Sequence, residues 1–211
     1  MVKVPHKTLE RNLFAQGYDP VIAVDEVGMA CLAGPVTVCA VLIRPGFFDR
    51  YDRRLIRMRD SKTLLPHHRE RYARILRELP GLMWRVASCE PARIDELNIY
   101  QASRLAMRNA ISELGVTGNP IVLVDGNKKV PGLTLPQQAI IRGDRKVWSI
   151  AAASIIAKVH RDALMTALAA EYPGYGFEVH KGYPTALHRE RLAALGPCPL
   201  HRRSFHGVDG N

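Results

Sequence analysis

The sequence predicts an α/β fold in which a mixed five-stranded sheet is flanked by helices, followed by a small C-terminal helical lobe. Two observations predict the sheet: short β-branched apolar runs come first, and later runs alternate with amphipathic stretches. A third observation predicts the lobe, because the last forty residues are rich in turn residues such as Pro173-Gly174 and Gly182.

Each expected strand is a short apolar run that ends at a turn signal or at an acidic residue. The first three runs are joined by short connections, which favours an antiparallel meander. The fourth run, IVLV, is unbroken and is followed directly by Asp125. The expected strands cover residues 21–24, 35–43, 82–89, 121–124 and 139–142.

The expected helices are marked by apolar residues at helical spacing. Pro66 suits a first helical turn, and Pro80-Gly81 ends that helix. Gly115 ends a second, longer helix. A third helix is rich in alanine, whose small side chain allows close approach to a sheet. The expected helices cover about 66–79, 94–114, 147–171 and 185–195.

Composition and charge bound the class of protein. The chain has 211 residues, of which 47% are hydrophobic and 24% charged, which excludes a disordered chain and a disulfide-stapled miniprotein. Its formal net charge of +10 favours a polyanionic partner such as nucleic acid. Eleven Lys and Arg stand against four acidic residues between positions 44 and 77. A solvated helix face is the alternative explanation for the arginines at 69–77.

Cysteine usage and apolar run length indicate the compartment. The four cysteines form no CxxC pair, so buried reduced thiols are expected and no zinc site can be assembled from them. The N-terminus lacks an apolar core long enough for a signal peptide, and no stretch approaches a membrane span. We therefore expect a cytoplasmic protein without a membrane partner. The cysteines are Cys31, Cys39, Cys89 and Cys198.

Acidic residues follow two of the expected strands. Asp25 and Glu26 end the first, and Asp125 ends the fourth. Asp144 lies between the last strand and the alanine-rich helix. Because ligands gather outside the ends of central strands in open α/β sheets, these carboxylates are expected to converge. Each acid alone has an ordinary alternative, since acids commonly end strands and cap helices.

A carboxylate cluster predicts a divalent metal site. Clustered carboxylates repel one another unless a cation neutralises them. Oxygen ligands without His or Cys favour Mg²⁺ or Mn²⁺ over zinc. Two such ions would activate water and stabilise the leaving oxygen of an in-line displacement at phosphorus. A second basic group near the C-terminus, His201 to Arg203, is expected to add salt-sensitive affinity for a nucleic acid backbone.

The ordered motifs of the chain resemble the bacterial ribonuclease HII family. They are VIAVDEVG, DSKTL, ELNIYQASRLAM, IVLVDGN, IIRGD, SIAAASIIAKVHRD, HKGYPT and HRRSF. The resemblance implies an RNase H-like fold and an endonuclease that cuts the RNA strand of RNA–DNA hybrids. It also implies cleavage on the 5′ side of ribonucleotides embedded in duplex DNA, leaving 3′-hydroxyl and 5′-phosphate ends.

The resemblance also implies roles for individual residues. The family's catalytic, metal-binding carboxylates correspond to Asp25, Glu26, Asp125 and Asp144. The tyrosine of the HKGY motif, which stacks on the sugar at the RNA–DNA junction, corresponds to Tyr183. A core aromatic of the lobe is the alternative for that residue. Lys62, in the DSK motif, corresponds to a phosphate contact.

One motif departs from the family. The family has Gly-Arg-Gly where this chain has Gly28-Met29-Ala30, a segment whose backbone contacts the ribose 2′-hydroxyl in the family. The change removes a cation and adds a Cβ, and a positive φ at Ala30 would add a backbone cost. It therefore concerns substrate selection rather than metal binding.

The resemblance predicts an RNase H-like catalytic domain over residues 1–171 and a substrate-binding lobe over residues 172–211. No N-terminal domain of ribonuclease HIII type and no sliding-clamp-binding tail is evident, so we expect a monomer that requires no protein partner. Two alternatives remain at this point. One is another RNase H-like nuclease, such as a junction resolvase. The other is a catalytically silent module that binds RNA–DNA junctions, which the complete set of carboxylates disfavours.

Overall fold

The computed structural model describes residues 5–50 and 64–209, and its centre is a mixed five-stranded sheet in the order β3-β2-β1-β4-β5. The first three strands in chain order are antiparallel neighbours, and β4 and β5 run parallel to β1. The predicted meander and mixed sheet are therefore confirmed. The strands are β1 (Val21–Val27), β2 (Val36–Ile43), β3 (Met83–Cys89), β4 (Ile121–Asp125) and β5 (Gln137–Ile140).

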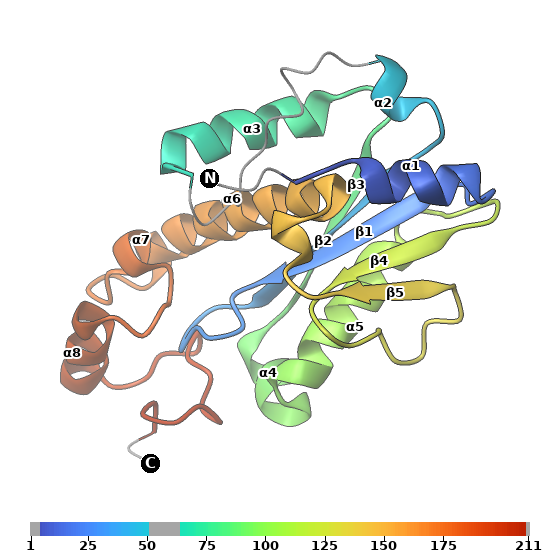
Figure 1. Cartoon of the computed structure of the whole chain (residues 1–211). Coiled ribbons are helices and arrows are strands. Elements are labelled where there is room, and N and C mark those ends of the chain that lie inside the picture. The colour runs from blue at the N-terminus through green and yellow to red at the C-terminus, as the bar shows by residue number, and fades with distance from the viewer. Residues whose placement is uncertain (1–4, 51–63, 210–211) are drawn as a thin grey trace.

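Helices cover both faces of the sheet (Figure 1). The alanine-rich helix α6 (Trp148–Glu171) lies along one face together with α3 (Pro66–Glu78) and α1 (Thr8–Ala15). Helix α5 (Ile99–Ser112) covers the other face. Alternate residues of β1 consequently enter two separate cores, one beneath α6 and the other beneath α5. Burial on both faces explains why the strand is an unbroken apolar run rather than an alternating one.

The helix expected over residues 94–114 is two helices, which corrects that prediction. α4 (Pro91–Leu97) ends at Asn98, whose φ of 68° is left-handed, and α5 starts immediately afterwards. The Asn98 carboxamide oxygen accepts the backbone N–H groups of Tyr100 and Gln101, at 3.0 and 3.1 Å. Asparagine tolerates the left-handed region and satisfies the free donors of a helix start, so the apolar periodicity passes through the break unchanged.

Other element boundaries differ where pairing with a distant strand, rather than the local sequence, sets them. β1 continues to Val27, so Asp25 and Glu26 lie within the strand rather than after it. β5 is Gln137–Ile140 rather than residues 139–142, and it leads into the short 3₁₀ helix η2 (Gly143–Arg145). Among the described residues, three helices were not predicted: α1, the single turn α2 (Phe47–Arg50) and the single turn α7 (Phe177–His180).

The segment after α6 forms two helices beyond the C-terminal end of α6, namely α7 (Phe177–His180) and the predicted α8 (Ala186–Leu195) (Figure 1). It closes a small apolar cluster that also includes Ala33 and Met165 from the preceding chain. The division between residues 171 and 172 stays a prediction.

Two predictions about the whole chain can be compared with the described residues. All four cysteines are free and buried, as expected. Burial raises the pKa of the Cys39 thiol far above its ordinary value, which makes it an inert apolar side chain. Within the described ranges, none of the helices is long and apolar enough to cross a membrane.

Candidate active site

The parallel pairing of β1 and β4 places two of the predicted carboxylates side by side. Val24 faces Val124 in the strand register, so Asp25 and Asp125 occupy neighbouring positions one residue further on. Asp144 is brought to the same edge by η2, which follows the neighbouring strand β5. The structure therefore brings together the residues that the sequence singled out.

Asp25 lies at the electrostatic centre of this group. It is buried, and burial raises the pKa of its carboxyl well above the ordinary value. The nearby charges of the other three carboxylates add to the rise, in the order Glu26, Asp125, Asp144. A hydrogen bond from Ser154 of α6 opposes it. Ionised Asp25 is thus costly in the folded chain, and a bound cation would remove that cost.

The position of Asp144 depends on a close approach of backbone to carboxylate. The Gly143 N–H donates to the Asp125 carboxylate at 2.6 Å. A Cβ at residue 143 would lie 2.5 Å from Ile150 and 3.1 Å from the same carboxylate oxygen. Glycine is therefore required here by space, and it ties η2 to the end of β4.

The donor set fits a hard divalent cation. The four side chains offer only carboxylate oxygens, which suit Mg²⁺ or Mn²⁺ and disfavour zinc. Among the residues that the structure describes, however, no three acidic, histidine or cysteine side chains already converge on one ion position. Asp125 instead accepts the Gly143 hydrogen bond. The carboxylates are close neighbours without being preorganised as a complete coordination shell.

A buried arginine links the Gly28–Ala30 segment to the turn that carries Tyr183. Arg161 of α6 is fully buried and donates to the carbonyl oxygens of Pro35, Ala33 and Lys181, at 2.9, 3.0 and 2.8 Å. A Cβ at Gly28, whose φ is +92°, would lie 2.5 Å from Arg161 Nε. Because Gly28 packs on this guanidinium and the Tyr183 ring lies 5.9 Å from it, the structure brings these two predicted substrate-binding residues close to one another.

The Met29-Ala30 departure is accommodated without backbone strain. Ala30 is exposed and is not among the positive-φ residues, so the conditional backbone cost does not arise. Met29 is half-buried against the core beneath α5, and its carbonyl oxygen accepts from Arg202 Nη1 at 3.2 Å. The turn therefore keeps a defined backbone although its central side chain has changed.

The ring of Tyr183 lies close to two cations of α6. Lys158 Nζ is 5.0 Å and the Arg161 guanidinium carbon 5.9 Å from the ring centroid. Lys158 is held in turn by Asp162 at 2.7 Å. Burial raises the pKa of Tyr183 to about 12, so its hydroxyl is neutral at physiological pH. The half-buried ring thus has a fixed position beside the predicted site.

Of the expectations about basic residues, one stays a prediction and another is wrong. Lys62 lies outside the described residues. His201 and Arg202 are buried, so the prediction that they belong to an exposed basic group is wrong for both. Arg202 donates to the carbonyl oxygens of Gly34 and Met29, which lie far away in the sequence. Arg203 alone of the three is exposed.

Several residues at this edge were not identified from the sequence. Ser154, Lys158 and Arg161 face the site from α6, and a signal for them exists. They are polar residues at helical spacing within an otherwise alanine- and isoleucine-rich helix, which places them on one face. No comparable signal marks the buried His188, because its partners lie on a turn and on the C-terminal segment.

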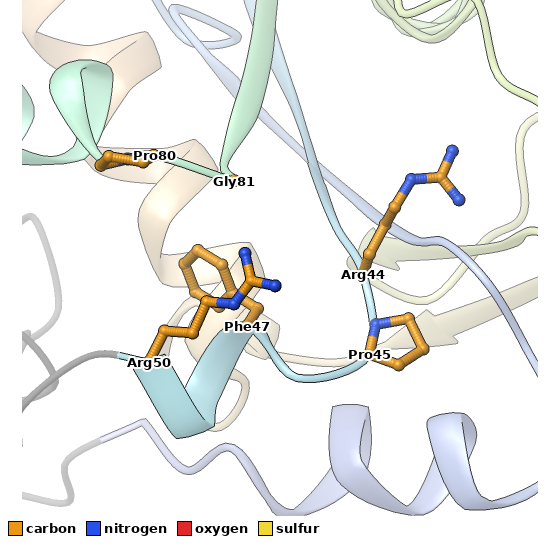
Figure 2. A pocket seen from close by; sticks show the side chains of 6 residues that line it. All are labelled: Arg44, Pro45, Phe47, Arg50, Pro80 and Gly81. Atoms are coloured by element: carbon orange, nitrogen blue, oxygen red, sulfur yellow. The ribbon is translucent and has the colours of Figure 1, made fainter.

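A pocket elsewhere on the molecule is separate from this site. Figure 2 shows its lining: Arg44, Pro45, Phe47, Arg50, Pro80 and Gly81. Arg44 follows the C-terminal end of β2, which pairs antiparallel with the start of β1. The pocket therefore lies at the opposite end of the central strands from Asp25. Its Arg44 is already paired with Asp19 at 2.7 Å.

Replacing Gly182 by alanine should destabilise the protein more than replacing Gly196. Both residues have a positive φ, which costs alanine about 1–2 kcal/mol. A Cβ at Gly182 would also collide with the Ala33 carbonyl oxygen, whereas nothing lies within 4 Å of one at Gly196. We expect the Tm of Gly182→Ala to fall several degrees below that of Gly196→Ala. Equal Tm values would show that the contact between residue 182 and the 28–35 segment is loose.

Comparison with known proteins identifies a family. A family model described as Ribonuclease HII matches residues 22–208. The chain is 46% identical over 182 residues to ribonuclease HII of Chlorobium phaeobacteroides, covering 86% of this chain and 87% of that protein. The solved ribonuclease H2 of Pyrococcus horikoshii is 26% identical with a TM-score of 0.74, covering 90% and 95% of the two chains.

A further solved structure, Bst-RNase HIII in complex with Mn²⁺, has a TM-score of 0.70 at 18% identity, covering 90% of this chain and 68% of that one. At this identity the similarity shows the fold alone.

Proposed function

This chain belongs to the ribonuclease HII family and is an RNase H endonuclease, and we propose that it also cuts the 5′ side of ribonucleotides embedded in duplex DNA. The proposed products carry 3′-hydroxyl and 5′-phosphate ends. The observation that supports a hydrolytic site is the group of carboxylates around buried Asp25 at the ends of β1 and β4. A bound divalent cation would offset the repulsion among these carboxylates and the cost of burying an ionised Asp25.

The proposed metal-binding and catalytic residues are Asp25, Glu26, Asp125 and Asp144. Mg²⁺ or Mn²⁺ would supply an activated water and stabilise the leaving oxygen, with two ions acting in an in-line displacement. That a similarly folded ribonuclease HIII is solved with Mn²⁺ agrees with this choice of ion. Asp25 would contribute a charge held in a buried position, and Ser154 would orient its carboxylate.

Substrate selection is proposed to depend on two segments near the carboxylates, the turn after β1 and the turn that carries Tyr183. The backbone of the Gly28-Met29-Ala30 turn would contact the ribose 2′-hydroxyl, and the Tyr183 ring would stack on the sugar at the junction. Arg161 supports both by holding residues 33, 35 and 181. Lys62 is proposed to contact phosphate. We expect the protein to act as a monomer without a protein partner.

One assay tests this function against its alternatives. Three substrates are compared: a DNA duplex with one ribonucleotide, an RNA–DNA hybrid and a four-way DNA junction. We expect the first two to be cut with Mn²⁺ or Mg²⁺, and all cleavage to stop when a chelator removes the ion. Cutting of the junction alone would favour a resolvase. Binding of the single-ribonucleotide duplex without cleavage in either ion would favour a silent binding module.

Restoring an arginine at position 29 should improve use of the single-ribonucleotide duplex. We expect Met29→Arg to raise kcat/KM on that duplex a few-fold more than on the hybrid, because an added phosphate contact acts at the selecting turn. The slope of log affinity against log salt should steepen by roughly one counterion.

Ala30→Gly is the control for this change. Since Ala30 is exposed and free of positive-φ strain, that variant alone should gain little. Equal gains on the duplex and the hybrid, or an unchanged salt slope, would remove position 29 from substrate selection.

A further inference from the structure

Three buried histidines form a group behind the turn that carries Tyr183. They are His180, His188 and His201, all less than 10% exposed. His180 stacks on His188 with ring centroids 4.1 Å apart. His188 and His201 meet through their Nε2 atoms, which are 3.1 Å apart. None of the contacts described for these rings involves the carboxylates of the candidate active site.

Backbone partners fix which nitrogen carries the proton on each ring of this pair. The Cys198 N–H donates to His201 Nδ1 at 3.1 Å, so the proton of neutral His201 is on Nε2. His188 Nδ1 lies 2.9 Å from the Tyr183 carbonyl oxygen, which can only accept, so neutral His188 carries its proton on Nδ1. His201 Nε2–H therefore donates to His188 Nε2, and His188 Nδ1–H donates to Tyr183.

A second protonation is unfavourable on either ring. Protonating His188 at Nε2 would set two N–H groups against each other, and protonating His201 at Nδ1 would do the same against the Cys198 N–H. Burial lowers the pKa of both His188 and His201 to about 4. The pair is thus neutral at physiological pH, with the direction of both hydrogen bonds fixed.

The same geometry leaves no place for a metal. Cys198 Sγ lies 3.2 Å from His201 Nδ1, which suggests a Cys–His site at first sight. The two histidines, however, direct nitrogen atoms at each other, and their remaining nitrogens are occupied by backbone groups. The described residues contain no group of three such side chains that could hold an ion. The pair instead forms hydrogen bonds with the backbone of Tyr183 and Cys198.

The backbone of Tyr183 is fixed on both sides. Its carbonyl oxygen accepts from His188 and from the Thr185 N–H at 2.8 Å, and its own N–H donates to the His180 carbonyl at 2.9 Å. The preceding Gly182 N–H donates to His180 Nδ1 at 3.1 Å. Thr185 Oγ1 in turn accepts from the His188 N–H at 3.2 Å, which places His188 in the first turn of α8, facing back toward Tyr183.

We propose that His188 and His201 are positioning residues for substrate recognition, acting through the Tyr183 carbonyl to hold that ring at the ribonucleotide. The inference rests on the proposed function, because it requires Tyr183 to contact substrate. His201 is anchored at the same point of the chain as Arg202, which holds the Met29 carbonyl. Both substrate-recognising segments are thereby tied to one dipeptide near the C-terminus.

Two matched substitutions of His188 separate positioning from packing. His188→Asn places its amide near the Nδ1 position and keeps a donor for the Tyr183 carbonyl, whereas His188→Gln moves the amide toward Nε2 and loses that donor. On the single-ribonucleotide duplex we expect His188→Gln to lower kcat/KM about 10-fold and His188→Asn less than about 3-fold, since small misplacements of a contact residue are costly. Equal losses for the two variants at similar Tm would overturn the proposal.

A double-mutant cycle with Tyr183→Ala tests whether His188 acts through Tyr183. If it does, His188→Gln has no further effect on kcat/KM once the ring is absent. A 10-fold loss that persists in the Tyr183→Ala background contradicts the proposal, as does a Tyr183→Ala variant that cuts as well as the unsubstituted protein.

His201→Asn is the variant to use if His188→Gln does not fold. It keeps an acceptor for the Cys198 N–H and removes the donor to His188, so we expect a similar loss of kcat/KM on the single-ribonucleotide duplex. The Tyr183→Ala background should again abolish that loss. A loss that persists there, or none at all, would overturn the proposal. Absence of cleavage by the unsubstituted protein would instead refute the proposed function itself.

Discussion

Asp25→Asn should abolish cleavage and at the same time raise the Tm of the metal-free protein. The amide keeps the shape of the side chain but removes a negative charge from the centre of the carboxylate group, so we expect a loss of at least about 100-fold in kcat. Without a cation the same charge lowers the free energy of unfolding, because Asp25 is buried and has Glu26, Asp125 and Asp144 as neighbours.

The sign of the pH dependence follows from the raised pKa. Folded Asp25 binds its proton at pH values where the unfolded residue has released it, so the free energy of unfolding falls as pH rises from near 4 through the folded pKa. Asparagine lacks this loss. The Tm gap between the variant and the unsubstituted protein should therefore widen as pH increases, and added Mg²⁺ should narrow it by stabilising only the protein that binds it.

Asp49→Asn is the matched control for this experiment. Asp49 is exposed and pairs with Arg11 on the surface, so its replacement should change the free energy of unfolding by less than about 1 kcal/mol and leave cleavage intact. A Tm gap at Asp25 that does not depend on pH would show that its carboxyl is not the strained group. Cleavage near the unsubstituted rate would remove Asp25 from the site.

The grouping of the carboxylates was predictable from the sequence. Short apolar runs identify the strands, and in an open α/β sheet the ends of central strands lie side by side. Apolar runs identify β1 and β4, and their parallel pairing brings Asp25 beside Asp125 without further information. The strand limits were less predictable, because the extension of β1 to Val27 depends on its pairing with Thr37 of β2. The break at Asn98 was missed because a single residue in the left-handed region leaves the apolar periodicity intact.

The buried side chains that hold the Gly28–Ala30 turn and the Tyr183 turn were not predictable from local sequence. Arg161, Arg202 and His201 carry the residue types of a basic surface, yet all three are buried. Their burial is possible because backbone carbonyl and N–H groups from distant parts of the chain, such as Ala33 and Gly34, form hydrogen bonds with them. Net charge describes affinity for a partner, whereas burial of a given arginine depends on tertiary contacts.

Tyr183→Ala should lower kcat/KM on the single-ribonucleotide duplex by about 10- to 100-fold. Stacking on an aromatic ring contributes about 1–3 kcal/mol per nucleotide in proteins that bind single strands. The ring also lies close to Lys158 and Arg161, so its removal takes away the aromatic group near both cations. The hybrid should be affected less, since it offers ribose contacts at neighbouring positions.

Tyr183→Phe distinguishes the ring from its hydroxyl in this experiment. The neutral hydroxyl, with a pKa of about 12, does not act as a base at physiological pH, so phenylalanine should lose clearly less activity than alanine. Kinetics on the duplex and the hybrid, with Tm measured in parallel, give the comparison. If alanine lowers the Tm but leaves kcat/KM on the duplex unchanged, Tyr183 is a core aromatic of the C-terminal segment, and selection of ribonucleotides then rests on the Gly28–Ala30 turn alone.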